Sequence, residues 1–333
     1  YGDRAANFMV QNSDFFLSIG CRLGIGLVGY DYEGFACNAK KIVVDVDEEE
    51  LSKPSVIPDI PIKADAKTFL EMFSGELGDY RLANQPWVDK TQYWKRHYAV
   101  DLPEYREEKN GINSYHFISV LSERVSDDAV FLLDTGSCFH VHAQAFKVKY
   151  GQRHVITGGL STMGYSPASV GLAVANKGKE VFCVSGDGSF QFNLQELQTI
   201  VHNKLPIKTI ILNNQGYLLI RLTQNNFQDG RLVGEGPDTG VSFPDMEKIA
   251  GAFGIKFIRI SKSVEIDEKI SELLSFQGAV ICEVLTPREQ ILIPRVASKQ
   301  LDDGTMVSMP YDDMFPFLPR EEYAENCVRE ILK

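Results

Sequence analysis

The chain lacks the sequence features of secreted, membrane-spanning and nucleic-acid-binding proteins. Its six cysteines are scattered over 333 residues without a Cys-x-x-Cys pair, so the sequence predicts neither a disulfide framework nor a zinc site. No apolar run reaches the ~20 residues that a membrane span requires. The formal net charge of −11 at pH 7 disfavours nucleic acid and anionic membranes as partners. We therefore expect a cytoplasmic protein with reduced thiols.

Two further site types find no support in the sequence. The chain has no G-x-x-x-x-G-K-[ST] segment, which argues against a P-loop nucleotide enzyme. His140 and His142 resemble a metal-binding pair only superficially, because residues two positions apart on a predicted helix point in different directions. We do not expect them to bind a metal.

The chain does contain an alternation of helical and strand patterns, within an average globular composition of 44% hydrophobic and 24% charged residues. This alternation predicts the α/β class, with two doubly wound, mainly parallel sheets. We expect a partial Rossmann-like domain over 1–80, a linker over 81–112, and a second domain with a C-terminal tail over 113–333. The expected helices are 4–11, 65–73, 87–98, 114–125, 138–147, 166–176, 193–202, 243–252 and 265–275, and the expected strands are 15–19, 41–46, 129–134, 153–156, 180–185, 207–212, 256–260 and 278–285.

The strongest chemical signal is the turn Gly186-Asp187-Gly188-Ser189, which follows the apolar strand 180–185. The next predicted strand ends at Asn213-Asn214-Gln215-Gly216-Tyr217. Asp187 and Asn214 therefore both stand at carboxyl ends of strands, where parallel sheets bind ligands. Carboxylate, amide and carbonyl oxygens are hard ligands suited to Mg²⁺. The spacing predicts a diphosphate bound through Mg²⁺, with an ordinary strand-end turn as the alternative.

These residues resemble the thiamine-diphosphate motif of the acetolactate synthase, pyruvate oxidase and 2-oxo acid decarboxylase family. In that family the aspartate, the asparagine and a main-chain carbonyl two residues later hold Mg²⁺ on the cofactor's diphosphate. The resemblance implies that Asp187, Asn214 and the carbonyl of Gly216 are metal ligands. It also implies that residues 1–80 are the family's middle domain and 113–333 its diphosphate-binding domain.

Two further segments carry the same resemblance. The first is Gly158-Gly159-Leu160-Ser161-Thr162-Met163-Gly164-Tyr165-Ser166-Pro167-Ala168, which is similar to the family's segment that bends the cofactor. The resemblance implies that Met163 is the bulky residue that causes the bend. It also implies that the carbonyl of Ser161 accepts a hydrogen bond from the pyrimidine. Thr135-Gly136-Ser137 resembles a third loop at the diphosphate, although Gly136-Ser137-Cys138-Phe139 departs from the Gly-Gln-His-Gln of acetolactate synthases. The implied cofactor site comprises Thr135, Gly136, Ser137, Ser161, Met163, Gly186, Asp187, Gly188, Ser189, Asn214, Gly216 and Tyr217.

The segment Gly24-Ile25-Gly26-Leu27-Val28-Gly29 spells the G-x-G-x-x-G of dinucleotide-binding domains, with Asp45 and Asp47 about 20 residues further on. That fingerprint needs a helix opening at its last glycines, whereas the sequence after Gly29 is aromatic and irregular. The resemblance offers FAD as a second hypothesis, because the middle domain of acetolactate synthases carries FAD partly through an arginine that matches Arg22. A domain that only packs is the third hypothesis.

The resemblance also implies a missing part. Family members begin with a domain that binds the pyrimidine ring and supplies a catalytic glutamate, which no residue here matches. We therefore expect no catalytic residue in this chain, no activity of the isolated chain, and a fragment of a longer protein or a subunit that needs this domain from another chain.

The implied activity is thiamine-diphosphate- and Mg²⁺-dependent decarboxylation and carboligation of 2-oxo acids such as pyruvate, in a homodimer or homotetramer. A decarboxylase or lyase of the same family and a noncatalytic cofactor-binding subunit stay open as alternatives. The segment 294–300 is expected to lie over the cofactor.

Overall fold

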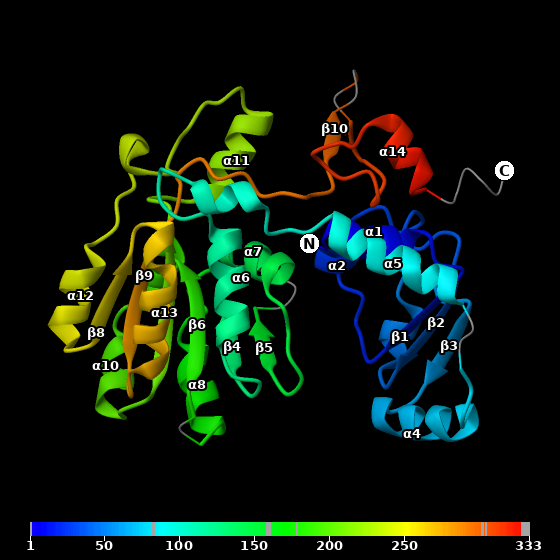
Figure 1. Cartoon of the computed structure of the whole chain (residues 1–333), viewed down its shortest axis with the longest axis horizontal. Helices are drawn as coiled ribbons and strands as arrows, with labels where there is room; N and C mark the ends of the chain where they lie inside the picture. Colours follow the sequence, from blue (N-terminus) through cyan, green and yellow to red (C-terminus); the bar gives the residue numbers. More distant parts are fainter. Residues whose placement is uncertain are drawn as a thin grey trace. The chain divides into compact units, whose positions relative to one another are not determined.

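The computed structural model describes residues 2–81, 84–157, 161–177, 179–300, 303 and 305–327. The chain divides into two compact units, a first unit within 1–99 and 293–333 and a second unit within 100–292 (Figure 1). Among the described residues, no helix combines the length and the apolarity that a membrane crossing requires.

Six parallel strands form the sheet of the second unit: β4 (Val130–Leu133), β5 (Arg153–Ile156), β6 (Val181–Gly186), β7 (Ile207–Asn213), β8 (Lys256–Ile260) and β9 (Val280–Leu285). Their order across the sheet is β5-β4-β6-β7-β9-β8. The chain passes from β4 outward to β5 on one side and from β6 outward to β7 on the other, so the direction reverses between β4 and β6. In open parallel sheets, ligands bind at the carboxyl ends of the strands beside such a reversal.

Helices cover both faces of this sheet because its strands are apolar on both sides. In β4, Phe131 and Leu133 belong to one buried cluster, whereas Leu132 between them belongs to another. Successive side chains of a strand point to opposite faces, so the two clusters lie on opposite sides of the sheet. The first cluster includes residues of α6 (Ser114–Arg124), α7 (Ser137–Ala145) and α13 (Ile266–Ser275), and the second includes residues of α8 (Ala168–Ala175), α10 (Glu196–His202) and α12 (Met246–Phe253). The predicted doubly wound α/β fold is confirmed.

Two helices near the carboxyl edge of the sheet differ from the prediction. The turn after β6 continues as a short helix, α9 (Asp187–Phe190), and the predicted helix 193–202 begins only at Glu196. A ten-residue helix, α11 (Leu218–Phe227), was not predicted at all. Its first residue follows Tyr217, whose side chain makes no capping hydrogen bond, so the usual start signal is absent.

The first unit has a smaller parallel sheet made of β1 (Phe15–Ile19), β2 (Lys40–Asp45) and β3 (Ile60–Lys63). The strand β3 was not predicted, because a four-residue edge strand that contains Pro61 carries little periodic signal. Helices of this unit before residue 100 are α1 (Arg4–Gln11), α2 (Ile25–Val28), α3 (Glu48–Ser52), α4 (Ala66–Leu77) and α5 (Gln85–His97).

The described residues after Leu292 belong to the first unit, although the sequence grouped them with residues 113–292. Tyr311 packs in a buried cluster with residues of the N-terminal segment, and its hydroxyl donates to the carbonyl oxygen of Val28. The Trp94 Nε1 atom donates to Asn326 Oδ1 at 2.7 Å. This segment contains β10 (Ser298–Gln300), β11 (Met306–Ser308) and α14 (Arg320–Glu325), of which the two strands pair antiparallel.

Candidate cofactor site

All the residues that the sequence assigned to a cofactor line one cavity in the second unit. The cavity has a volume of about 280 Å³. Three apolar residues that the sequence did not assign, at 218–220 in the first turn of α11, also line it. Of the motif at 158–168, Gly158, Gly159 and Leu160 lie outside the described residues. The predicted residues in the lining are Thr135, Gly136, Ser137, Ser161, Met163, Gly186, Asp187, Gly188, Ser189, Asn214, Gly216 and Tyr217.

Asp187 is buried at the carboxyl end of β6, where it joins two backbone turns. Its Oδ1 atom accepts a hydrogen bond from the amide of Gly188 at 2.8 Å, and its Oδ2 atom accepts one from the amide of Gly216 at 3.0 Å. Burial raises the pKa of Asp187 to about 7, and these backbone hydrogen bonds oppose the shift. A cation beside this carboxylate would favour its charged form.

Asn214 has a buried amide oxygen and lines the cavity. The residue is 4% exposed. Its Oδ1 atom is buried and has no hydrogen-bond partner within the described part of the chain. Burying a polar oxygen without a partner is unfavourable. A metal ion in the cavity would supply the missing partner.

The neighbouring Asn213 has a different role, because the protein satisfies its side chain. Its Oδ1 atom accepts from the amide of Gln215 at 2.9 Å, and its Nδ2 atom donates to Glu283 Oε1 at 2.7 Å. Glu283 in turn accepts from Arg259 Nε at 2.7 Å. The first asparagine thus fixes the turn, and the second is available to the cavity.

A buried carboxylate missed by the sequence reasoning joins two of the loops around the cavity to strand β6. Asp134 is fully buried at the end of β4. Its Oδ1 atom accepts from the amides of Thr135 at 2.8 Å and Tyr165 at 3.1 Å, and its Oδ2 atom accepts from Ser185 Oγ at 2.8 Å. An acid at the end of a buried strand was the only available signal for this role.

The loop that carries Ser161 and Met163 is held against the turn at Asp187. Ser189 Oγ accepts from the amide of Gly164 at 2.8 Å, and Asn193 Nδ2 donates to the carbonyl of Gly164 at 2.7 Å. Met163 is 38% exposed and lines the cavity. The loop therefore presents a bulky apolar side chain at a position fixed by two hydrogen bonds.

Gly188 allows the turn after β6 and the loop after β7 to approach closely. A Cβ atom at Gly188 would overlap the ring of Tyr217, which packs edge-on against Phe243. A larger residue at Gly188 would push the loop after β7 away from the turn after β6.

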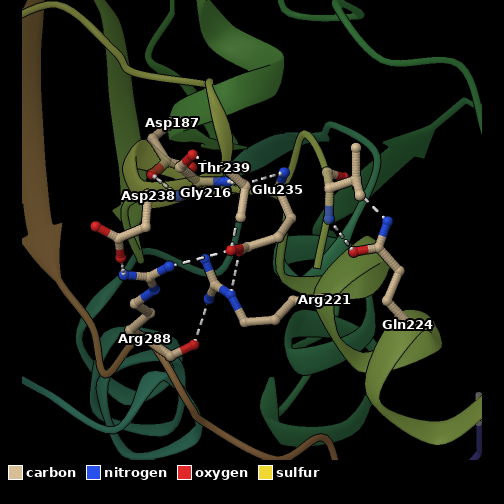
Figure 2. A network of polar contacts seen from close by, with 10 residues as sticks. Asp187, Gly216, Arg221, Gln224, Glu235, Asp238, Thr239 and Arg288 are labelled. Atoms are coloured by element: carbon tan, nitrogen blue, oxygen red, sulfur yellow. Dashed lines mark hydrogen bonds and ion pairs between the residues drawn. The ribbon is translucent and has the colours of Figure 1, made fainter. Parts of the chain in front are cut away.

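A network of charged side chains, none of them expected from the sequence, lies behind this site (Figure 2). Arg221 and Glu235 are both fully buried and form an ion pair, and Arg288 donates to Glu235 Oε1 at 3.1 Å. Arg221 follows the cavity-lining residues of α11 by one position. The network therefore borders the end of the cavity that is lined by α11.

The two histidines of the predicted helix contact different partners. His140 Nδ1 lies 2.8 Å from the carbonyl oxygen of Gly136, whereas His142 Nε2 lies 3.0 Å from His154 Nδ1. Burial lowers the pKa of His142 well below its usual value, so its ring is neutral at pH 7.

The glycine-rich segment of the first unit does not form the helix that a dinucleotide fingerprint needs. Its helix α2 covers only Ile25–Val28 and ends at Gly29. Arg22, the residue behind the expectation of FAD, pairs with Glu50 at 2.7 Å and has a mostly exposed side chain.

Comparisons with known proteins bear on both units. Residues 134–284 match the family described as "Thiamine pyrophosphate enzyme, C-terminal TPP binding domain", and residues 1–73 match "Thiamine pyrophosphate enzyme, central domain". The chain belongs to the thiamine pyrophosphate enzyme family. The first match includes every residue that lines the cavity, and neither match supports a flavin.

Similar proteins within this family are acetolactate synthases. The chain is 32% identical over 303 residues to the acetolactate synthase large subunit of Cyanidium caldarium, covering 89% of this chain and 50% of the relative. It is 32% identical over 302 residues to the large subunit of Porphyra purpurea, with coverages of 89% and 50%. It is 29% identical over 307 residues to "Acetolactate synthase 2, chloroplastic" of Zea mays, with coverages of 90% and 47%. The chain thus spans about half the length of these relatives.

Proposed function

We propose that the cavity binds the diphosphate of thiamine diphosphate through Mg²⁺. The observation that carries the proposal is the buried Oδ1 atom of Asn214, which has no hydrogen-bond partner among the described residues and belongs to the same cavity as Asp187. Together with the carbonyl of Gly216 they offer three hard oxygen ligands, which leaves coordination positions for phosphate oxygens and water. The family membership of residues 134–284 supports the same assignment.

The loop after β4 suits the diphosphate. Thr135, Gly136 and Ser137 lead into the nine-residue helix α7, and Gly136 has a φ of 107°, a backbone conformation that side chains rarely adopt. Free amide groups and the positive end of the helix dipole favour a phosphate at such a position. We infer that these small residues bind the anionic end of the cofactor.

The remaining walls suit the aromatic end of the cofactor. Met163 and the apolar first turn of α11 exclude water there, and the carbonyl of Ser161 is the acceptor for the pyrimidine that the family resemblance implies. Bound thiamine diphosphate supplies the nucleophile and the electron sink for decarboxylation of 2-oxo acids. The residues of this chain bind, orient and shield it.

The proposed overall activity is decarboxylation and carboligation of 2-oxo acids such as pyruvate. It rests on the names of the relatives and needs a pyrimidine-binding domain with its glutamate, from this polypeptide or from another chain. A homodimer or homotetramer and a cytoplasmic location stay predictions, as does the placement of 294–300 over the cofactor. A decarboxylase or lyase of the same family is the second candidate, because Ser137, Cys138 and Phe139 depart from the acetolactate synthase pattern.

Calorimetric titration of the chain with thiamine diphosphate, with and without Mg²⁺, tests the proposal. Asp187→Ala removes a charged metal ligand and should abolish the Mg²⁺-dependent part of the binding. Asp267→Ala is the control, because that carboxylate is 83% exposed in a surface pair with Arg124. Equal Mg²⁺-dependent affinity in Asp187→Ala and the unsubstituted chain would refute the assignment.

A further inference from the structure

A buried ion pair contacts the loop that carries the third proposed metal ligand (Figure 2). Arg221 Nε and Glu235 Oε2 form the pair, and both side chains are 0% exposed. Arg221 Nη1 also donates to the carbonyl oxygen of Arg288 at 2.5 Å. Apolar residues of similar volume often stabilise a fold as well as a buried ion pair does. Stability is therefore a weak explanation for this pair.

The pair contacts Gly216 directly. A Cβ atom at Gly216 would overlap both Arg221 Nη2 and the carbonyl oxygen of Glu235, so only glycine fits between them. The same carbonyl oxygen accepts from the amide of Tyr217 at 2.8 Å. On its other side, the amide of Gly216 donates to Asp187 Oδ2 at 3.0 Å. Gly216 is therefore clamped between the proposed metal-binding carboxylate and the ion pair.

Glu235 is itself held in place by further contacts. Arg288 Nη2 donates to Glu235 Oε1 at 3.1 Å, and Thr239 Oγ1 accepts from the amide of Glu235 at 2.9 Å. Arg288 also pairs at 2.7 Å with Asp238, whose side chain is 79% exposed. The position of Glu235 is thus fixed by several hydrogen bonds in addition to its ion pair with Arg221.

Arg221 Nη2 has no hydrogen-bond partner among the residues that the structure describes. This nitrogen is the guanidinium atom that meets Gly216. The guanidinium is therefore oriented by Glu235 and Arg288 with one edge packed against the loop. Its position fixes the loop sterically.

We propose that Arg221 and Glu235 are positioning residues that hold the Gly216 carbonyl in the geometry that Mg²⁺ requires. The inference rests on the proposed function, because it assumes that this carbonyl is a metal ligand. Mg²⁺ demands near-ideal octahedral geometry with short bonds, whereas Ca²⁺ accepts longer and more irregular coordination. A loop clamped in this way therefore favours Mg²⁺ over Ca²⁺.

The test compares the two metals in a variant that removes the pair and keeps the volume. In the double variant Arg221→Met with Glu235→Leu, apolar side chains replace both charges, so the protein should still fold. Each metal is titrated by calorimetry into the full chain saturated with thiamine diphosphate, and thermal denaturation checks folding. The Mg²⁺ dissociation constant should rise about 10–100-fold, as for other residues that orient metal ligands. The Ca²⁺ constant should rise by a smaller factor, so the selectivity ratio falls.

Asp267→Asn is the matched control, because Asp267 is 83% exposed in a surface pair with Arg124, outside this network. It should leave both dissociation constants unchanged. If the double variant does not fold, Arg221→Lys replaces it: lysine keeps a positive charge for Glu235 but has no Nη2 atom against the loop. The selectivity ratio must fall there as well.

The ratio of the two dissociation constants distinguishes positioning from a general loss of structure. Partial unfolding would weaken the binding of Mg²⁺ and of Ca²⁺ by the same factor and leave the ratio unchanged. An unchanged ratio in the folded variant overturns the inference and leaves the proposed function standing. Wild-type Mg²⁺ affinity in Asp187→Ala overturns the proposed function itself, and the inference with it.

Discussion

Replacing Asn214 with leucine should stabilise the protein without ligands and reduce the additional stability that the ligands provide. The Oδ1 atom of Asn214 is buried and unpaired in the described part of the chain. An unsatisfied buried polar group costs about 1–3 kcal/mol, and leucine has the same number and branching of side-chain heavy atoms. The free energy of unfolding of the metal-free variant should rise by a similar amount, which corresponds to ~2–4 °C in Tm per kcal/mol for a unit of this size.

With Mg²⁺ and thiamine diphosphate this advantage should shrink. A ligand at 100 times its Kd stabilises the folded state by about 2.7 kcal/mol, and the variant loses part of this gain with one metal ligand. Thermal denaturation followed by circular dichroism, in chelator and then in Mg²⁺ with cofactor, measures both states. Asn225→Leu, an exposed position on α11, should change stability by less than ~0.5 kcal/mol in either. A metal-free Asn214→Leu variant less stable than the unsubstituted chain would refute the reasoning.

Three further predictions concern stability without ligands. Gly188→Ala should destabilise the fold by about 1–3 kcal/mol in urea denaturation, because its methyl group would overlap a tyrosine ring, whereas Gly186→Ala has open space and should be near neutral. Ser185→Ala should cost about 1–3 kcal/mol in the same assay, because it leaves a carboxylate oxygen of the buried Asp134 without its hydroxyl donor. His142→Gln should reduce the decrease in the free energy of unfolding that occurs as the pH falls below ~6.5. Burial lowers the pKa of His142 in the folded state, so in this pH range only the unfolded chain gains a proton at residue 142.

The sign and size of the histidine effect follow from proton linkage. Stability is full above the unfolded pKa and falls as the pH drops toward the folded one, by at most about 1.4 kcal/mol per pH unit for one proton. The comparison of denaturation curves between pH 7 and 5 cancels the groups that do not contact residue 142, including Asp187. His154, whose Nδ1 atom lies 3.0 Å from His142 Nε2, adds to the measured difference. Equal slopes in the two proteins would contradict the lowered pKa, because His142 would then bind a proton as readily in the folded chain as in the unfolded one. For the serine prediction, Ser126→Ala is the control, since its hydroxyl donates to Asp128 on the surface.

The cavity residues were predictable because chain order and strand direction bring them together. Gly186 ends one parallel strand and Asn213 ends its neighbour, so the turns that follow must meet at the same edge of the sheet. Strand β4 ends at the same edge, which adds Thr135. Motif spacing therefore sufficed for the loops that line the cavity.

The network behind the cavity was not predictable, because its members share no periodic pattern. Glu235 lies 14 positions after Arg221, and Arg288 lies 53 positions after Glu235, in segments between regular elements. The helix that carries Arg221 was itself missed. Likewise, Tyr311 contacts Val28 across 283 positions, a contact that no local pattern signals.

The most direct test of the account is the position of the metal. Crystals grown with thiamine diphosphate and Mn²⁺, which replaces Mg²⁺ at oxygen sites, give an anomalous signal that locates the ion. We predict one ion bound to the Asp187 carboxylate, Asn214 Oδ1 and the Gly216 carbonyl, at bond lengths near the ~2.0–2.1 Å of octahedral Mg²⁺. An ion bound elsewhere, or a cofactor whose diphosphate lies outside this cavity, would contradict the account.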